Sequence, residues 1–208
     1  MTVKESAQKL VSLANDGFEA TLKVFSNIAS ETIGEFGDVR TILNFFKTTT
    51  KAFEFLLLAL RSLQKITDVD KLAINKTAEE AIELLYPSIQ SAGVYKGQMV
   101  RTLSQPNQAL FSLVAVAKKY RELSIIAEKT ENLAQLQDLK IAAFQLKEDY
   151  DAAITWAQTY PEEFKPLQEL NHVEDIFQTI AEIEHEGKKE PVKKEHDTLF
   201  IPREILGH

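Results

Sequence analysis

The chain contains no cysteine, and only seven of its 208 residues are glycine. Without cysteine there is no disulfide, no thiolate metal site and no thiol nucleophile. The sequence also has no glycine-rich phosphate loop and no G-x-S-x-G nucleophile turn, motifs in which glycine brings the backbone close to a substrate. We therefore expect a non-enzymatic protein without a cofactor.

Long apolar runs and a surplus of basic residues are also missing. The longest apolar runs, "FLLLAL" at 55–60 and "LVAVA" at 113–117, are far shorter than the ~20 residues that a membrane span requires. The 24 basic residues are outnumbered by 31 acidic ones, which gives a formal net charge of −7 and argues against a nucleic-acid partner. Residues 1–10 lack the apolar core of a signal peptide. We expect a cytoplasmic protein with no transmembrane span.

The sequence does contain strong helical periodicity, and 44% of its residues are hydrophobic, enough for a buried core. Thr2 and Glu5 have capping-box spacing, which predicts a first helix. Its apolar stripe ends near Gly34 and consists of Ala7, Leu10, Ala14, Phe18, Leu22, Phe25, Ile28 and Ile33. After Gly37 and Asp38, a second helix is expected to carry Val39, Ile42, Phe46, Phe53, Leu56, Leu60 and Leu63 on one side.

The stretch between Pro106 and Pro161 contains neither glycine nor proline, so one continuous helix is an alternative to two. A first stripe consists of Ala109, Leu113, Val116, Tyr120, Leu123, Ala127, Thr130 and Ala134. The next stripe is out of phase with it and consists of Leu136, Leu139, Ala143, Leu146, Tyr150, Ala153, Ala157 and Tyr160. Because Asn132 lies at this change of phase and asparagine is a favoured N-cap, we predict two helices.

Two further helices complete the expected fold. One begins after Asp68 or Asp70 and carries Leu72, Ala78, Ile82, Leu85 and Ile89. The last begins around 161–166, ends at Gly187 and has the stripe Leu167, Leu170, Val173, Phe177, Ile180 and Ile183. The sequence thus predicts an all-α fold, an elongated antiparallel helical bundle of about six helices over residues 1–187, followed by a C-terminal tail at 188–208.

Two pairs in the last predicted helix, Glu169-x-x-His172 and Glu182-x-x-His185, have the spacing that dimetal bundles use. Both pairs fall on the same predicted helix, about 20 Å apart, so they cannot share one centre. We therefore expect no metal site and no catalytic histidine, with both pairs on a surface helix.

Phenylalanine is abundant, with 12 residues. Six of them occupy mostly stripe positions and are expected in the core: Phe18, Phe25, Phe46, Phe53, Phe144 and Phe177. Three others fit less easily into a single core and are candidates for a second interface: Phe45, Phe55 and Phe111.

The tail combines a charged stretch at 188–197 with an apolar cluster in "TLFIPREIL" at 198–206. We interpret the charged stretch as a linker and the cluster as a docking segment. The candidate partner-binding residues are Leu199, Phe200, Ile201, Ile205 and Leu206. The segment would dock either on its own bundle or on another chain, and the sequence leaves both open.

The favoured function is a non-enzymatic interaction or assembly protein, whose amphipathic helices bind a protein partner or a second copy. The alternative is a bundle that associates with a lipid or membrane surface, as apolipoprotein-like, granule-coating or pore-forming helices do. This alternative depends on two apolar stretches that contain basic residues near their ends, "AFEFLLLALRSL" at 52–63 and "ALFSLVAVAKKY" at 109–120.

Overall fold

The structure, a computed structural model, describes residues 1–31, 73, 75–80, 82–83 and 105–189. Helices account for 88% of this described part, which contains no strand, so the predicted all-α fold is confirmed. The α-helices are α1 (Val3–Glu31), α6 (Gln105–Glu128), α7 (Leu136–Ile154), α8 (Lys165–Leu170) and α9 (Val173–Lys189). Two short 3-10 helices are η2 (Leu133–Gln135) and η3 (Thr155–Gln158).

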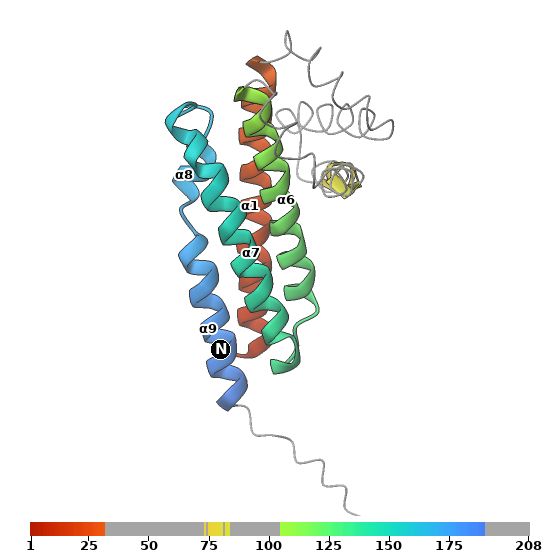
Figure 1. The fold of residues 1–208 in the computed structure, drawn as a ribbon. Helices are drawn as coiled ribbons and strands as arrows, with labels where there is room; N and C mark the ends of the chain where they lie inside the picture. Colours follow the sequence, from red (N-terminus) through yellow and green to blue (C-terminus); the bar gives the residue numbers. More distant parts are fainter. Residues whose placement is uncertain (32–72, 74, 81, 84–104, 190–208) are drawn as a thin grey trace, which may run out of the picture.

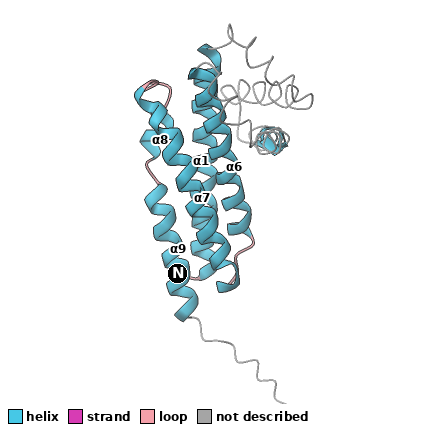
Figure 2. Cartoon of the chain, in the orientation of Figure 1, coloured by secondary structure: helices cyan, strands magenta, loops and turns pink. Residues whose placement is uncertain are grey.

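Helices α1, α6, α7 and α9 lie side by side as an elongated bundle, and each runs antiparallel to the next along the chain (Figure 1). Helix α1 packs against α6, α8 and α9, while α7 packs against α6 and α9. Short loops join α6 to α7 and α7 to α8 (Figure 2). This arrangement follows from helices with one apolar face and short connections, which favour antiparallel neighbours.

Helix α1 forms as its sequence predicts. The Thr2 backbone N–H donates to Glu5 Oε2 at 2.7 Å, and the Glu5 N–H donates to Thr2 Oγ1 at 3.2 Å. These are the two reciprocal bonds of a capping box, and they satisfy backbone donors that the helix itself leaves unpaired. All seven residues of the predicted stripe between Ala7 and Ile28 are buried, so the expected core face is confirmed.

The break between α6 and α7 is also as predicted. Helix α6 ends at Glu128, and Asn132 caps η2 by accepting a hydrogen bond from the Ala134 N–H at 2.7 Å. Before the break, Thr130 Oγ1 donates to the Ile126 carbonyl at 2.8 Å. The change of phase in the sequence therefore marks two helices rather than one.

The prediction of a single last helix ending at Gly187 is wrong. Asn171 adopts a left-handed backbone with φ 31° and separates α8 from α9, a conformation that asparagine tolerates better than most residues. Helix α9 then continues through Gly187 to Lys189. Gly187 lies inside the helix. Because it has no Cβ, the side chain of Leu133 can pack in the space that a Cβ would occupy. Lys188 and Lys189, expected in the tail, therefore belong to α9.

Several predicted features lie outside the described residues: the second helix at 39–63, with Phe45, Phe46, Phe53 and Phe55, and the tail from residue 190. Of the helix expected after Asp68 or Asp70, the described residues 75–80 and 82–83 are helical. Ala78 and Ile82 in this segment are buried, as predicted.

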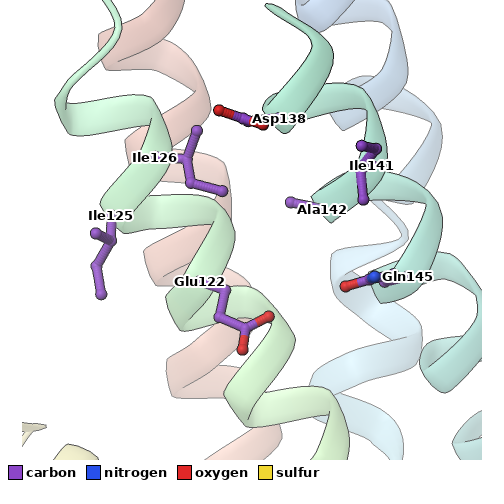
Figure 3. Close-up of a pocket in the computed structure, with 7 residues that line it drawn as sticks. All are labelled: Glu122, Ile125, Ile126, Asp138, Ile141, Ala142 and Gln145. Carbon is purple, nitrogen blue, oxygen red and sulfur yellow. The ribbon is translucent and has the colours of Figure 1, made fainter. Parts of the chain in front are cut away.

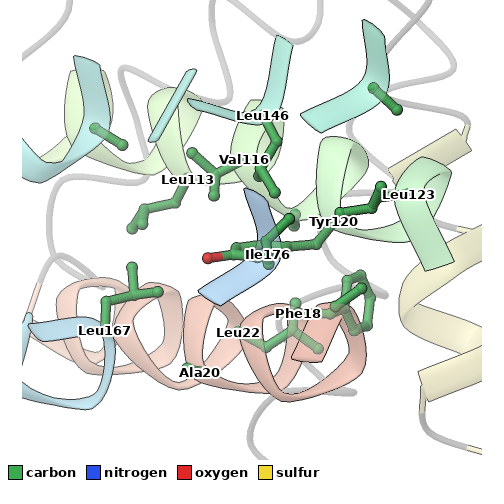
Figure 4. Close-up of a cluster of buried hydrophobic side chains, with 14 of the residues drawn as sticks. Phe18, Ala20, Leu22, Leu113, Val116, Tyr120, Leu123, Leu146, Leu167 and Ile176 are labelled. Atoms are coloured by element: carbon green, nitrogen blue, oxygen red, sulfur yellow. The ribbon is translucent and has the colours of Figure 1, made fainter. Parts of the chain in front are cut away.

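The core lies where the helices face one another (Figure 4). Helix α1 contributes Phe18 and Leu22, and side chains from α6, α7, α8 and α9 belong to the same cluster: Leu113, Val116, Tyr120, Leu123, Leu146, Leu167 and Ile176. Fully burying one such aliphatic or aromatic side chain contributes about 1.5–3 kcal/mol. The cluster therefore fixes how the helices pack, which in turn places the surface described next.

Candidate functional site

An open groove lies between the last turns of α6 and the first turns of α7 (Figure 3). Its volume is about 300 Å³, the lower end of the range of about 300–1,000 Å³ that is usual for ligand pockets. We call it the α6–α7 groove, and its lining residues are Glu122, Ile125, Ile126, Asp138, Ile141, Ala142 and Gln145.

The groove has apolar walls and a polar rim. Ile126 of α6 and Ala142 of α7 point into the space between the helices (Figure 3). At one end, Lys119 Nζ donates to Gln145 Oε1 at 3.2 Å and lies 3.4 Å from Glu122 Oε2. The Lys119–Gln145 bond bridges α6 and α7, whereas Lys119 and Glu122 both belong to α6. Because the other charged lining residue, Asp138, is also an acid, the rim favours an apolar occupant that carries a basic group.

At the edge of the groove, α7 exposes two large apolar side chains, the lining residue Ile141 and, next to the lining, Phe144. Ile141 is 47% exposed and Phe144 is 58% exposed. Within the described part of the chain, only Met1 at the N-terminus is another large apolar side chain with comparable exposure. Single exposed apolar residues are normal on a protein surface, but two on adjacent turns beside an apolar groove form a candidate binding surface.

The expectation that Phe144 belongs to the core is wrong. The core-facing side of α7 carries Leu139, Ala143 and Leu146. Phe144 follows Ala143 by one residue, or about 100° around the helix, so its ring faces outward. Phe18 and Phe25 are buried as expected, whereas Phe111 and Phe177 are partly buried against the core.

Sequence reasoning missed the residues that line the groove, although a signal was available. Ile125 and Ile126 fall off the stripe that buries Leu123 and Ala127, and Ile141 falls off the next stripe. A large apolar residue outside the core stripe widens the apolar face of its helix. Such residues on two helices that pack together indicate a shared apolar surface.

His172 is not on a surface helix, contrary to expectation. It follows Asn171 at the break between α8 and α9, is 2% exposed, and stacks on Tyr120 with ring centroids 5.5 Å apart. Burial lowers the pKa of His172, and the nearby carboxylates Asp16 and Asp175 oppose this effect only partly. Neither ring nitrogen has a hydrogen-bond partner among the described residues. Because a substrate cannot reach it, we interpret His172 as a packing residue.

The break between α8 and α9 divides the first Glu-x-x-His pair, whereas the second pair stays together on α9. Glu169 is exposed on α8, whereas His172 is buried beyond the helix break. In the second pair, Glu182 Oε2 lies 3.5 Å from Lys9 Nζ. Within the described ranges, no group of three or more His, Cys, Asp or Glu side chains could hold a metal ion.

A second depression, with a volume of about 430 Å³, lies between α1 and α8. Its lining residues are Asp16, Glu19, Ala20, Lys23, Pro166, Glu169 and Leu170. Four of these seven residues are charged, and charged side chains at an open surface are normally solvated. The α6–α7 groove, with its apolar walls, is therefore the stronger candidate.

The predicted docking residues Leu199, Phe200, Ile201, Ile205 and Leu206 lie outside the described residues, so their role stays a prediction. Among the helices that the structure describes, none has the length and apolar character to cross a membrane. Comparison with family models, curated proteins and solved structures gives no match. Function is therefore argued from the geometry of this chain.

Proposed function

We propose that this protein is a non-enzymatic interaction protein whose α6–α7 groove binds a short apolar segment of a partner protein. The observation that carries the proposal is the exposure of Ile141, which lines the groove, and of Phe144 next to it. A helix that keeps two large apolar side chains in solvent gains free energy when a partner covers them.

The size of this surface favours a weak and reversible contact. Full burial of such a side chain contributes about 1.5–3 kcal/mol. Because Ile141 and Phe144 are only about half exposed, covering them would contribute roughly 0.7–1.5 kcal/mol each, whereas association itself costs at least about 4 kcal/mol. Further contacts inside the groove must supply the remaining affinity. Such a site suits an interface at the small end of the known range, below about 1,200 Å², which is typical of transient partners.

The rim defines the chemistry of the partner. Glu122 and Asp138 border the groove, and Lys119 already lies beside Glu122. A partner segment with a lysine or arginine next to its apolar residues would place that cation near Asp138. Complementary charge of this kind contributes mainly to specificity and to the association rate.

The lipid alternative has less support. In "ALFSLVAVAKKY", which belongs to α6, the apolar residues Leu110, Leu113 and Val116 are buried. This stretch therefore packs in the core instead of facing a bilayer. The other motivating stretch, at 52–63, lies outside the described residues, and the lipid proposal depends on it alone.

The proposal can be tested with a photo-crosslinking amino acid at Phe144 and, as a control, at the exposed Gln168 of α8. Crosslinking in cells would identify candidates, and each would then be purified and its affinity measured by calorimetry. We expect a partner captured only from position 144, whose binding is weakened at least about tenfold by Ile141→Asp, roughly 1.4 kcal/mol, and not by Gln168→Asp.

Two results would contradict the proposal. One is equal capture from both positions, with affinities that Ile141→Asp does not change. The other is co-sedimentation with liposomes of phosphatidylcholine and phosphatidylserine that Ile141→Asp with Phe144→Asp abolishes, because this would assign the same surface to lipid.

A further inference from the structure

The end of α9 lies next to the start of α7. Lys140 Nζ of α7 is 2.9 Å from Glu184 Oε2 of α9, and Leu133 of η2 packs against Gly187. The chain therefore leaves α9 at Lys189 at the same end of the bundle as the α6–α7 groove, which lies at the first turns of α7 (Figure 1).

The exposed apolar side chains lie on the way from α9 to the groove. At about 100° per residue, Phe144 lies about 40° around α7 from Lys140, the residue that faces α9. Ile141 follows at about 100°, and Gln145, which lines the groove, at about 140°. Going around α7 from α9, one therefore meets Phe144 and then the groove, whose near edge is formed by Ile141.

We propose that residues 199–206 of the same chain dock in the α6–α7 groove as an intramolecular latch that a partner must displace. This inference rests on the proposed function, because it names a competitor for the same surface. The segment supplies the apolar residues Leu199, Phe200, Ile201, Ile205 and Leu206 for the groove and one basic residue, Arg203, for the rim acids, while the adjacent Glu204 offsets part of that charge.

The chain beyond α9 is long enough for residues 199–206 to reach the α6–α7 groove. Residues 190–198 can span up to about 30 Å when extended, whereas the groove lies one to two helix spacings of about 8–10 Å from α9. From Asp138 to Gln145 the groove extends about 10 Å along α7. Pro202 prevents one continuous helix over residues 199–206, but a single helical turn that begins at Pro202 would be about 7 Å long and would fit within the groove.

Tethering makes even a weak segment an effective competitor. A short flexible linker holds its peptide at about millimolar effective concentration. If the free peptide binds with a Kd of about 100 µM, the groove is about 90% occupied, and a competing ligand binds about tenfold more weakly to the intact chain. The latch would thus set the affinity threshold for a partner.

The absence of native cysteine allows a direct test in the full-length chain. Ile141→Cys would be labelled with a benzophenone maleimide, irradiated, and its crosslinks mapped by peptide mass spectrometry. The matched control is Lys4→Cys, an exposed position at the start of α1, which lies at the same end of the bundle as Lys189 (Figure 1). A tail tethered without a binding site would reach both probes equally.

We expect the probe at 141 to crosslink residues 199–206 within one monomer, with at least tenfold higher yield than the probe at 4. Phe200→Asp with Leu206→Asp should reduce the yield to the control level. Equal yields at both positions would overturn the latch. Crosslinks to the apolar segment 39–63 or to a second copy would also overturn it, because each would name another occupant.

A second measurement separates the latch from the proposed function. A fluorescent peptide of residues 198–206 is titrated into the wild-type chain and into the Phe200→Asp, Leu206→Asp chain. The latch predicts about tenfold tighter binding to the double variant, abolished by adding Ile141→Asp. Equal affinity for both chains that still requires Ile141 overturns only the latch. If the peptide binds neither chain, the latch fails, and the proposed function then depends on the partner experiment alone.

Discussion

The ring of His172 lies on the ring of Tyr120, with centroids 5.5 Å apart and planes inclined by 17°. The Tyr120 ring also lies against Gly17 of α1, where a Cβ would overlap it. Through these two contacts, the Tyr120 ring of α6 joins α1 to the junction between α8 and α9. Because both rings are buried, this part of the core is sensitive to charge and to volume.

Protonation of His172 should destabilise the fold. Burial holds its pKa below the ordinary value, with Asp16 of α1 and Asp175 of α9 opposing the shift and the neutral Tyr120 of α6 stacked on it. In the unfolded chain the pKa is about 6.5. The contribution of the neutral His172 to the free energy of unfolding is therefore fully present above that pH. It is lost as the pH falls, because the unfolded chain takes up a proton that the folded protein binds more weakly.

Urea unfolding at pH 8 and at pH 5.5 would measure this dependence. The uptake of one proton changes the free energy of unfolding by at most about 1.4 kcal/mol per pH unit. His172→Phe keeps an aromatic ring without the charge and should be less sensitive to pH. An unchanged pH dependence in this variant would contradict the prediction.

Gly17→Ala should lower the free energy of unfolding by about 1–3 kcal/mol, the usual cost of overpacking. The added methyl group would meet the fully buried Tyr120 ring, which has no room to move. Gly187→Ala is the matched control, because its methyl group would meet the half-buried Leu133, which can turn away. Thermal unfolding of both variants checks the difference, and equal losses would argue against a rigid contact at Gly17.

Tyr120→Phe should leave stability unchanged or increase it. The buried hydroxyl of Tyr120 has no hydrogen-bond partner among the described residues, and an unpaired buried polar group costs about 1–3 kcal/mol. Tyr150, which is only half-buried, provides the control substitution to phenylalanine and should show no change. A marked loss of stability in Tyr120→Phe would reveal a partner for the hydroxyl.

Phe144→Ala and Leu146→Ala compare the loss of an exposed and of a buried side chain on the same helix, α7. Leu146 is fully buried, so its truncation should cost about 2–5 kcal/mol. Phe144 is 58% exposed, and its truncation should cost less than about 1 kcal/mol. Chemical denaturation of both variants gives the comparison. Similar losses would mean that another part of the chain covers Phe144.

Asn132→Ala should cost about 0.5–2 kcal/mol, because it removes the acceptor for the Ala134 N–H. Asn132→Asp keeps an acceptor oxygen and should retain most of the stability. If the aspartate variant lost as much as the alanine variant, the cap would not explain the effect.

The sequence predicted the features that depend on residues near one another in the chain. The capping box at Thr2 and Glu5, the buried stripe of α1 and the break at Asn132 all follow from local spacing. Helix periodicity and capping are local properties, and for this reason a single sequence determines them.

Only the tertiary structure decided the rest. The burial of His172 depends on Tyr120 of another helix, and the break beside it depends on a left-handed backbone at Asn171. Phe144 and Ile141 stay exposed because α9 and α6 pack on either side of them and not over them. The stripe shows that a face is apolar, but which faces are covered depends on how the helices pack, and that is fixed by contacts between residues far apart in the chain.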